Sequence, residues 1–345
     1  MDVFAAAAAP TGPVCNTGPV SNVVIPVFNR PTATCVTIEA LNHTTRDVPF
    51  CITVVDNGSE PELRRRLLDL HREGLIHNLF LLPRNMGISC ACNLGWRAVD
   101  APFYIKFDND MHITAPDWLD RLFRLYARVE PRSTLGPSFS PEEVRRQPHL
   151  RCEDGELGIC VSNLCGQCLM VPRAVSDILG YWSEDYGLYG AEDGDYGLRM
   201  RCAGFPQYYY YAAPLMEHQG TNPRDYDLRL LDKGREHSRL FVEEDGGVGL
   251  FSLNGYLYNI CARSWRTPLR YRVLDVTRSH EVILGEDPAY APVARALRLS
   301  RELVNKEYAR SGNKGVIGDA FVRKIKRLWE DCGQGCSTIL QEGRA

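Results

Sequence analysis

Short apolar runs alternate with segments of helical spacing along residues 22–107 of the chain. The runs typical of buried strands are Asn22–Val27, Phe50–Val55, Leu79–Leu82 and Phe103–Phe107. The segments between them with apolar residues at helical spacing are Thr32–Asn42, Pro61–His71 and Ser89–Val99. This alternation predicts an α/β fold in which helices flank a mostly parallel sheet.

Polar clusters follow three of these predicted strands at the point where each strand ends. The clusters are Phe28-Asn29-Arg30, Asp56-Asn57-Gly58-Ser59 and Asp108-Asn109-Asp110. Ligands of such sheets bind beyond the carboxyl ends of the strands, so we expect the clusters to share one site. A GxGxxG loop is absent after the first strand, as is a P-loop lysine motif, which disfavours the ordinary dinucleotide-binding and P-loop classes.

Asp108 and Asp110 stand one residue apart after the fourth predicted strand. If the strand alternation continues to that point, the two carboxylates face the same way and repel each other. A divalent cation relieves this repulsion. The alternative is a solvated Asp-Asn turn that caps the next helix.

A second group of acids begins a predicted helix that runs to Cys202. Glu192, Asp193 and Asp195 stand there beside Gly190 and Gly194. Acids in a first turn stabilise a helix by completing its dipole, which accounts for one or two of them. Three acids in an aromatic-rich loop indicate a functional site.

The composition is that of a globular protein and narrows the possible partners. Hydrophobic residues make up 44% and charged residues 24% of the 345 residues, and the net charge is −3, so no global polybasic character indicates a nucleic-acid binder. No apolar run approaches the ~20 residues that a membrane span requires. Residues 262–345 carry 16 Lys and Arg against 10 Asp and Glu, a surplus that faces either an anionic partner or only solvent.

Thirteen cysteines are scattered through the chain. Their odd number and the chain length exclude a small disulfide scaffold and favour reduced thiols in a cytoplasmic protein. Two pairs, Cys165 with Cys168 and Cys332 with Cys336, resemble halves of a metal site. Neither pair has a clean partner pair, so a structural zinc is the less favoured interpretation.

The chain divides into three parts by its patterning. Residues 1–20 are rich in Pro, Gly and Ala and predict a flexible leader. Residues 21–250 are expected to form the main α/β domain, and residues 251–345 a C-terminal extension, first mixed and then helical. Further helical segments are expected at Arg224–Glu244, Pro292–Arg310 and Val316–Trp329. The last is basic and amphipathic, so it either touches a membrane surface peripherally or packs on its own domain.

The ordered motifs of residues 21–225 resemble those of nucleotide-sugar-dependent glycosyltransferases of the GT-A fold, family 2. The matching blocks are VVIPVFNR, VVDNGS, RNMGISCACNLGWRAV, FDND (the D-x-D element) and GAEDGDYGLRMRCAGF. Each block alone is weak evidence, whereas their order and spacing are specific. The resemblance implies the Rossmann-like GT-A fold and hexosyl transfer from a nucleoside diphosphate-sugar.

The resemblance also implies roles for the strand-end residues in holding a nucleotide-sugar. Phe28 would stack on the base, or else belong to the core. Asp56 would accept a hydrogen bond from the base imide, which favours UDP, or else cap a turn. Further donor-binding residues implied by the matched blocks are Pro26, Arg30, Arg84, Asn85, Asn93, Asp108 and Asn109.

The metal implied by the resemblance is Mn²⁺ or Mg²⁺, because hard oxygen ligands suit both ions and both bind diphosphate. Asp110 would bind it directly, with Asp108 shared between the metal and the ribose. His218 follows the acidic block and is the candidate third ligand. His112, two residues after Asp110, is its rival.

The acidic block would carry the chemistry on the acceptor side. Asp193 would take the acceptor proton in an inverting reaction, while Glu192 orients hydroxyl groups; retaining enzymes share much of this motif set. Trp182 and Tyr189, with Tyr186, would form an acceptor platform or else pack their loop against the core.

The sequence therefore predicts a metal-dependent glycosyltransferase that uses a UDP-sugar. Its acceptor is left open between protein, glycan and nucleic acid. The alternatives are a sugar nucleotidyltransferase, which usually has a Gly-rich loop that VFNRPTAT lacks, and a nucleotide-sugar-binding module with a degenerate site.

Overall fold

The computed structural model describes residues 20–45, 48–219, 233–243, 246–311 and 318–336. The predicted leader falls outside these ranges except for Val20. Residues 224–232 and 244 of the expected helical segment also lie outside them, as do Val316 and Ile317 of the predicted basic helix. Within these ranges, no helix is both long and apolar enough to span a bilayer.

The strand–helix alternation predicted for the first part of the chain is confirmed. The strands are β1 (Ser21–Val27), β2 (Phe50–Asp56), β3 (Asn78–Leu81) and β4 (Phe103–Phe107). The helices between them are α1 (Pro31–Thr44), α2 (Pro61–Arg72) and α3 (Ile88–Arg97). Both α1 and α2 begin with a proline, which suits the first turn of a helix because that position needs no backbone N–H partner.

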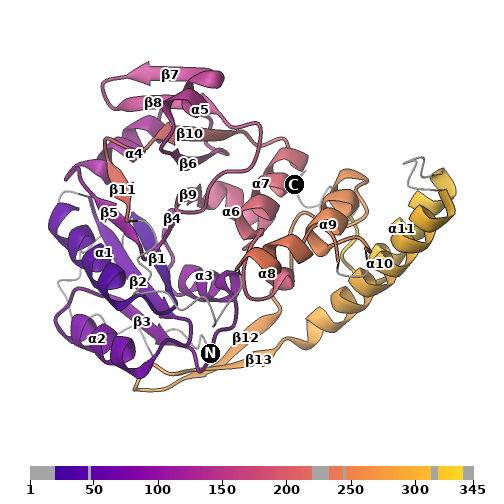
Figure 1. Ribbon diagram of the computed structural model, residues 1–345, viewed down its shortest axis with the longest axis horizontal. Coiled ribbons are helices and arrows are strands. Elements are labelled where there is room, and N and C mark those ends of the chain that lie inside the picture. Colours follow the sequence, from indigo (N-terminus) through magenta and orange to yellow (C-terminus); the bar gives the residue numbers. More distant parts are fainter. Residues whose placement is uncertain (1–19, 46–47, 220–232, 244–245, 312–317, 337–345) are drawn as a thin grey trace.

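The central sheet has nine strands in the order β3-β2-β1-β4-β9-β6-β10-β8-β7. The strands that follow β4 are β5 (Met111–Ile113), β6 (Thr134–Ser138), β7 (Pro148–Cys152), β8 (Gly155–Ile159), β9 (Cys168–Pro172), β10 (Gln207–Tyr211), β11 (Met216–His218), β12 (Tyr271–Val276) and β13 (Val282–Glu286). All strands of the central sheet except β8 and β9 run in one direction. The mostly parallel α/β architecture predicted from the sequence is therefore present (Figure 1).

Helices cover both faces of this sheet. The helices that follow α3 are α4 (Trp118–Tyr126), α5 (Pro141–Arg146), α6 (Arg173–Leu179), α7 (Glu192–Cys202), α8 (Lys233–Arg239), α9 (Leu250–Asn259), α10 (Ala291–Ser311) and α11 (Asp319–Asp331). Alternate residues of β1 enter different core clusters: Val23 and Ile25 pack in one, and Val24 in the other. This alternation explains why β1 is apolar throughout, since both of its faces are covered.

The carboxyl ends of β1, β2 and β4 meet at one edge of the sheet because these neighbouring strands are parallel. One sequence-based expectation is wrong in detail here. The strand β4 ends at Phe107, and Asp108 to Asp110 form a turn in which the Met111 N–H donates to the Asp108 carbonyl. The two acids are thus brought together by a turn rather than by strand alternation.

The C-terminal part of the chain is mixed in structure and then helical. Its hairpin β12–β13 lies beside β3. A β-bridge joins Glu281, the residue before β13, to Leu81 at the end of β3. The helices α10 and α11 lie side by side and project from the body of the molecule (Figure 1). Ile325 and Trp329 of the basic helix α11 are buried against the neighbouring helices, which is the packing alternative for its apolar stripe.

A buried ion pair links this C-terminal part to the loop before α7. Arg263 Nη1 lies 2.7 Å from Asp185 Oδ2, and each side chain is 1% exposed. The hydroxyl of Tyr290 donates to the other oxygen of Asp185. The boundary at residue 250 stays a prediction, but the two sides of it are joined by buried charge.

Candidate active site

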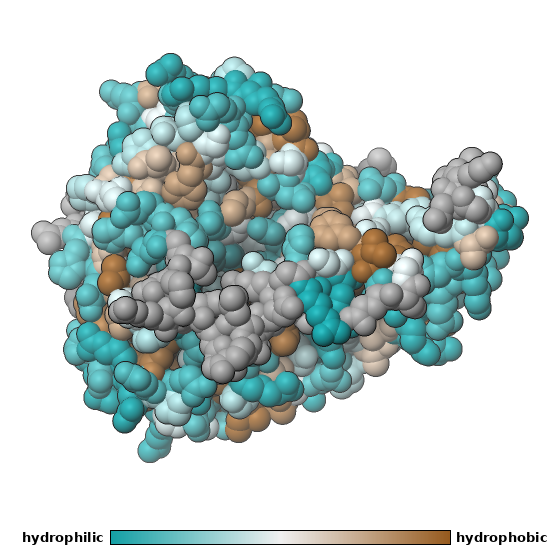
Figure 2. All heavy atoms as spheres, viewed as in Figure 1, coloured by the Kyte–Doolittle hydropathy of each residue, from teal (hydrophilic) through white to brown (hydrophobic). Residues whose placement is uncertain are grey.

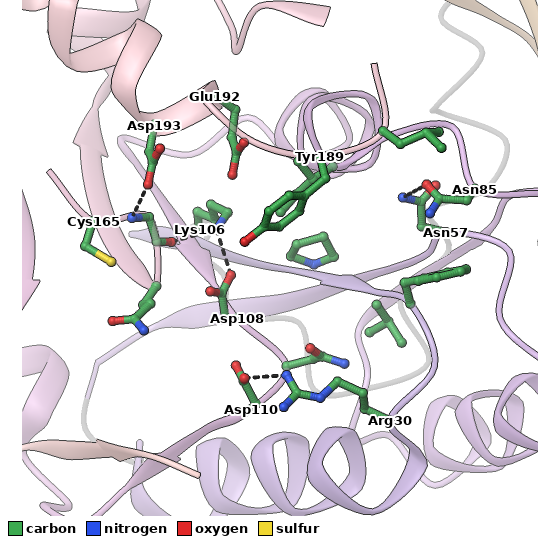
Figure 3. A pocket seen from close by; sticks show the side chains of 18 of the residues that line it. Arg30, Asn57, Asn85, Lys106, Asp108, Asp110, Cys165, Tyr189, Glu192 and Asp193 are labelled. Atoms are coloured by element: carbon green, nitrogen blue, oxygen red, sulfur yellow. Dashed lines mark hydrogen bonds and ion pairs between the residues drawn. The ribbon is translucent and has the colours of Figure 1, made fainter. Parts of the chain in front are cut away.

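A cavity of about 330 Å³ lies at the sheet edge where β1 and β4 end. It is lined by Pro26, Val27, Phe28, Arg30, Asn57, Asn85, Ile88, Lys106, Asp108, Asn109, Asp110, Cys165, Gly166, Gln167, Leu188, Tyr189, Glu192, Asp193 and His218. Figure 3 shows Glu192 and Asp193 on the side opposite Asp110 and Arg30. Most residues assigned to the site from the sequence therefore converge on one cavity.

The backbone is strained at two places on the rim of this cavity. Asn29 and Arg30 follow β1 with φ angles of 56° and 63°, and Ala191 precedes α7 with a φ angle of 62°. Residues with a Cβ rarely adopt this left-handed conformation, and such strain clusters at functional sites. At the first place, the Asn29 N–H donates to Ser59 Oγ at 2.8 Å, which ties the end of β1 to the loop after β2.

Asp110 is held between two basic side chains. The Arg30 guanidinium donates to its Oδ2 atom, and His218 Nε2 lies 3.0 Å from the same oxygen. Burial alone would raise the pKa of Asp110, but His218 and Arg30 lower it to about 2. The predicted candidate His218 is therefore beside Asp110. Its rival His112 is not among the lining residues and pairs instead with Glu217, Nδ1 to Oε1 at 3.1 Å.

Asp108 is paired with a lysine that sequence analysis assigned no role. Lys106 Nζ lies 2.7 Å from Asp108 Oδ1 and donates to the Gly166 carbonyl at 2.8 Å. Burial raises the pKa of Asp108, and the Lys106 charge opposes that shift. A signal was available in the sequence: a lysine inside an apolar strand needs an acidic partner, because lysine is almost never fully buried unless it is paired.

The side chains of Asp108, Asp110 and His218 suit a divalent cation, although in this structure they take part in ion pairs. Asp108 and Asp110 offer carboxylate oxygens and His218 an imidazole nitrogen, all facing the same cavity. Among the described residues, no three His, Cys, Asp or Glu side chains are arranged to hold a metal ion as they stand. A cation bound here would replace Arg30 as the partner of Asp110. All the cysteines that the structure describes are free thiols.

Glu192 and Asp193 begin α7 and differ in their surroundings. Asp193 is anchored by backbone donors: its Oδ2 accepts from the Gly166 N–H at 3.0 Å and its Oδ1 from the Gly194 N–H at 2.7 Å. Glu192 is buried, and its Oε2 atom has no hydrogen-bond partner among the residues that the structure describes. Burial, and then the charge of Asp193, raise the pKa of Glu192 to about 7.

The third acid of this block has a structural role. Asp195 points into the interior, where its Oδ2 accepts from Arg199 Nε at 2.6 Å and its Oδ1 from the Tyr186 hydroxyl at 2.6 Å. Of the three acids that the sequence analysis assigned to a functional site, Asp195 is therefore paired in the interior, because Arg199 neutralises its charge within α7.

Only one of the predicted acceptor-platform residues lines the cavity. Tyr189 does so, whereas Trp182 is fully buried and packs on Tyr196 with ring centroids 5.4 Å apart. Tyr186 is buried as well. Trp182 and Tyr186 therefore pack their loop against the core, which is the alternative to an acceptor platform.

Three residues predicted to bind the donor are not among those that line the cavity. Asp56 is buried, accepts from the Ser59 N–H at 3.1 Å and pairs with Arg64, which is the turn-cap alternative. Arg84 is exposed. Asn93 is buried and holds the backbone of Trp182 from both sides, accepting at Oδ1 and donating from Nδ2, each at 2.9 Å.

Asn57, which follows Asp56, lines the cavity instead. Its Nδ2 atom donates to Asn85 Oδ1 at 3.0 Å, which joins the loops after β2 and β3. Phe28 lines the cavity and is only partly buried, and its stacking role stays a prediction.

Residues 22–153 match the profile of Glycosyl transferase family 2. This match confirms, for residues 22–153, the resemblance to family 2 glycosyltransferases found in the sequence. No curated protein sequence matches the chain.

Several solved structures are similar to the chain at low sequence identity. GalNAc-T7 with UDP, GalNAc and Mn²⁺ is 13% identical at a TM-score of 0.49, with 95% of this chain and 57% of that chain covered. The mannosyltransferase PcManGT from Pyrobaculum calidifontis, in complex with GDP-Man and Mn²⁺, is 14% identical at a TM-score of 0.43, with 94% and 74% covered. Residues 1–349 of TarS from S. aureus are 16% identical at 0.43, with 56% and 60% covered, so this chain spans less than two thirds of that one.

Proposed function

We propose that the protein transfers a sugar from a nucleoside diphosphate-sugar to an acceptor hydroxyl, with the help of a divalent cation. The observation that carries this proposal is the pairing of two acidic walls across one cavity of a family 2 chain. Asp108 and Asp110 stand on one wall, and Glu192 and Asp193 on the other.

The donor proposed here is a UDP-sugar, held at the ends of β1, β2 and β4. Phe28 offers a ring to a base, and the amides of Asn57 and Asn85 offer polar groups beside it. Asp108, Asp110 and His218 would hold Mn²⁺ or Mg²⁺, which when bound neutralises charge on the leaving diphosphate. With a cation on Asp110, Arg30 would be free to pair with a phosphate of the donor.

The proposed reaction inverts the anomeric carbon. The acceptor oxygen forms a bond to that carbon while the bond to the diphosphate breaks, and the diphosphate leaves with the electron pair. The acceptor proton passes to a carboxylate of the acid pair, for which Asp193 is the sequence-based assignment. Lys106 lies buried between the two walls and offsets part of their negative charge.

Thermal shift with nucleotides tests the donor and the metal. We expect UDP with Mn²⁺ to raise the melting temperature, because a ligand that binds only the folded state stabilises it by mass action. Asp110→Ala should abolish the part of the shift that depends on Mn²⁺. Absence of any response to UDP, GDP or other nucleotides would contradict the proposal, and turnover of a sugar phosphate with a nucleoside triphosphate would favour the nucleotidyltransferase alternative.

Asp193→Asn tests the base. It should preserve the nucleotide shift and lower transfer by roughly 10²–10⁴-fold, the usual contribution of a positioned base. Full activity of this variant would show the assignment to be wrong, and Glu192, with its unpaired oxygen, would then be the base.

The free thiols agree with the cytoplasmic location expected from the sequence, which we retain as a proposal.

A further inference from the structure

A second cavity adjoins the acid pair on its far side. Its volume is about 210 Å³, and the residues of its wall that matter here are Asn163, Tyr189, Glu192, His237, Phe241 and Phe251. Tyr189, Glu192 and Asp193 line both cavities, so the acid pair is the partition between them. A group bound in the second cavity would therefore meet the same carboxylates as the donor.

The outer wall of the second cavity is aromatic. The rings of His237 and Phe241 lie 5.1 Å apart and those of Phe241 and Phe251 5.2 Å apart, measured between centroids. Phe241 is 40% exposed, so its ring offers apolar surface that a bound ligand would remove from water. The chain around the rings is fixed by backbone hydrogen bonds, from Gly249 N–H to the Phe241 carbonyl at 3.0 Å and from Phe251 N–H to the Leu240 carbonyl at 2.8 Å.

The inner wall is polar and has an unmet hydrogen-bonding capacity. Glu192 is 6% exposed, and within the described part of the chain its Oε2 atom lacks a hydrogen-bond partner, which is costly for a buried carboxylate. Asn163 adds a side-chain amide, whose Oδ1 atom accepts from Arg201 Nη2 at 3.1 Å. An aromatic surface that faces a carboxylate and an amide suits a ligand with one C–H face and a rim of hydroxyl groups.

A pyranose ring has this combination of surfaces, and the cavity is smaller than the one assigned to the nucleotide-sugar. We propose that the second cavity is the acceptor subsite and that it takes a pyranose of a glycan acceptor, with its C–H face on Phe241 and a hydroxyl group toward Glu192. This inference rests on the proposed glycosyltransferase function and names the acceptor class for it. The hydroxyl proton would pass to the acid pair as its oxygen bonds to the donor carbon.

Ligand-detected NMR of methyl hexopyranosides, with the full chain saturated with UDP and Mg²⁺, tests the proposal directly. We expect saturation transfer to the ring C–H protons of at least one glycoside. Phe241→Ala should weaken that binding about tenfold, as expected for the loss of one buried aromatic contact. Val242→Ala is the matched control, because Val242 is 59% exposed, next in sequence, and absent from the cavity wall.

Gly194→Ala provides a second variant, because alanine suits a helix and the change adds only one methyl group. A Cβ atom at residue 194 would lie 3.2 Å from Asn163 Nδ2 and 3.4 Å from Phe251 Cε2, so it narrows the second cavity. Gly194 does not line the first cavity, so UDP should shift the melting temperature of this variant as it shifts the wild type.

The outcomes separate this inference from the proposed function. Glycoside binding that is weakened by Phe241→Ala and Gly194→Ala but not by Val242→Ala supports the acceptor subsite. Binding that is equal in all variants, absence of binding to any glycoside, or transfer to a serine or threonine peptide alone would overturn it. Failure of UDP to stabilise the wild type would instead contradict the proposed function itself.

Discussion

Lys106 and Asp108 form an ion pair at the end of β4, with Nζ of the lysine 2.7 Å from Oδ1 of the aspartate. The lysine is 2% exposed and also donates to the Gly166 carbonyl. It therefore fixes the position of Asp108 and joins the end of β4 to the loop before β9. An acidic cavity that must exist before any cation binds needs such an internal counter-charge.

Lys106→Met should destabilise the fold by about 1–3 kcal/mol. The change leaves Asp108 without its buried partner, and the partial exposure of Asp108 keeps the loss below that of a fully buried broken pair. Urea unfolding measures the difference. The double variant Lys106→Met/Asp108→Asn should recover part of the loss, and Lys324→Met, at an exposed site on α11, should change little. Equal stability of Lys106→Met and Lys324→Met would contradict the structural role of the pair.

His218→Ala should weaken Mn²⁺ binding by roughly 10–100-fold, if the imidazole beside Asp110 joins the metal. The measurement is the Mn²⁺ concentration required for the UDP-dependent thermal shift. His112→Ala is the control, since that imidazole pairs with Glu217 and does not line the cavity. A stronger effect of His112→Ala than of His218→Ala would reverse the assignment of the third ligand.

The free energy of unfolding should fall as the pH rises from about 4.5 to about 7, because of Glu192. Burial raises the pKa of this carboxyl from 4.5 to about 7 in the folded state, so the folded protein binds more protons than the unfolded chain across this range. The contribution is at most about 3 kcal/mol, fully present below the unfolded pKa and lost as the pH approaches the folded one.

Urea unfolding at a series of pH values checks this slope. Glu192→Gln should flatten it, since the amide has no proton to lose, and should raise the stability at pH 8 relative to the wild type. Glu302→Gln, at an exposed carboxyl on α10, serves as the control. An identical pH slope in wild type and Glu192→Gln would be incompatible with a buried, partly protonated Glu192.

Gly58→Ala should cost more than about 3 kcal/mol, far more than Gly74→Ala. Both glycines have φ angles near +80°, where a Cβ alone costs about 1 kcal/mol. A Cβ at Gly58 would lie 2.3 Å from the Arg84 carbonyl carbon, whereas one at Gly74 would have no neighbour within 4 Å. Thermal unfolding of the two variants gives the comparison, and equal losses would refute the close approach of these loops.

The sequence predicted the first four strands, their helices and the edge where the site lies, because these depend on local periodicity. Asp108, Asp110, Asp193 and His218 converge as the ordered motifs indicated. Local patterns carry this information since each strand is buried on both faces and each ends in a polar turn.

The partners of individual side chains were beyond the reach of that reasoning. Lys106 bonds to Gly166, 60 residues away, and Asp56 turns to Arg64 while Asn57 faces the cavity. Trp182 shows the same limit, because an aromatic residue near a site has identical local patterning whether it packs inward or outward. The aromatic wall at Phe241 also escaped notice, since nothing in the sequence beyond residue 225 resembled a known motif.

The buried ion pair of Arg263 and Asp185 has a consequence for how the molecule unfolds. Removing the chain beyond residue 250 would leave the Asp185 carboxylate buried without its arginine partner. The loop that carries Tyr189 and Glu192 would then lose the ion pair that holds it in place. Helices α10 and α11 and the central sheet domain should therefore unfold in one cooperative transition. A shortened chain that ends before α9 should be poorly folded and inactive.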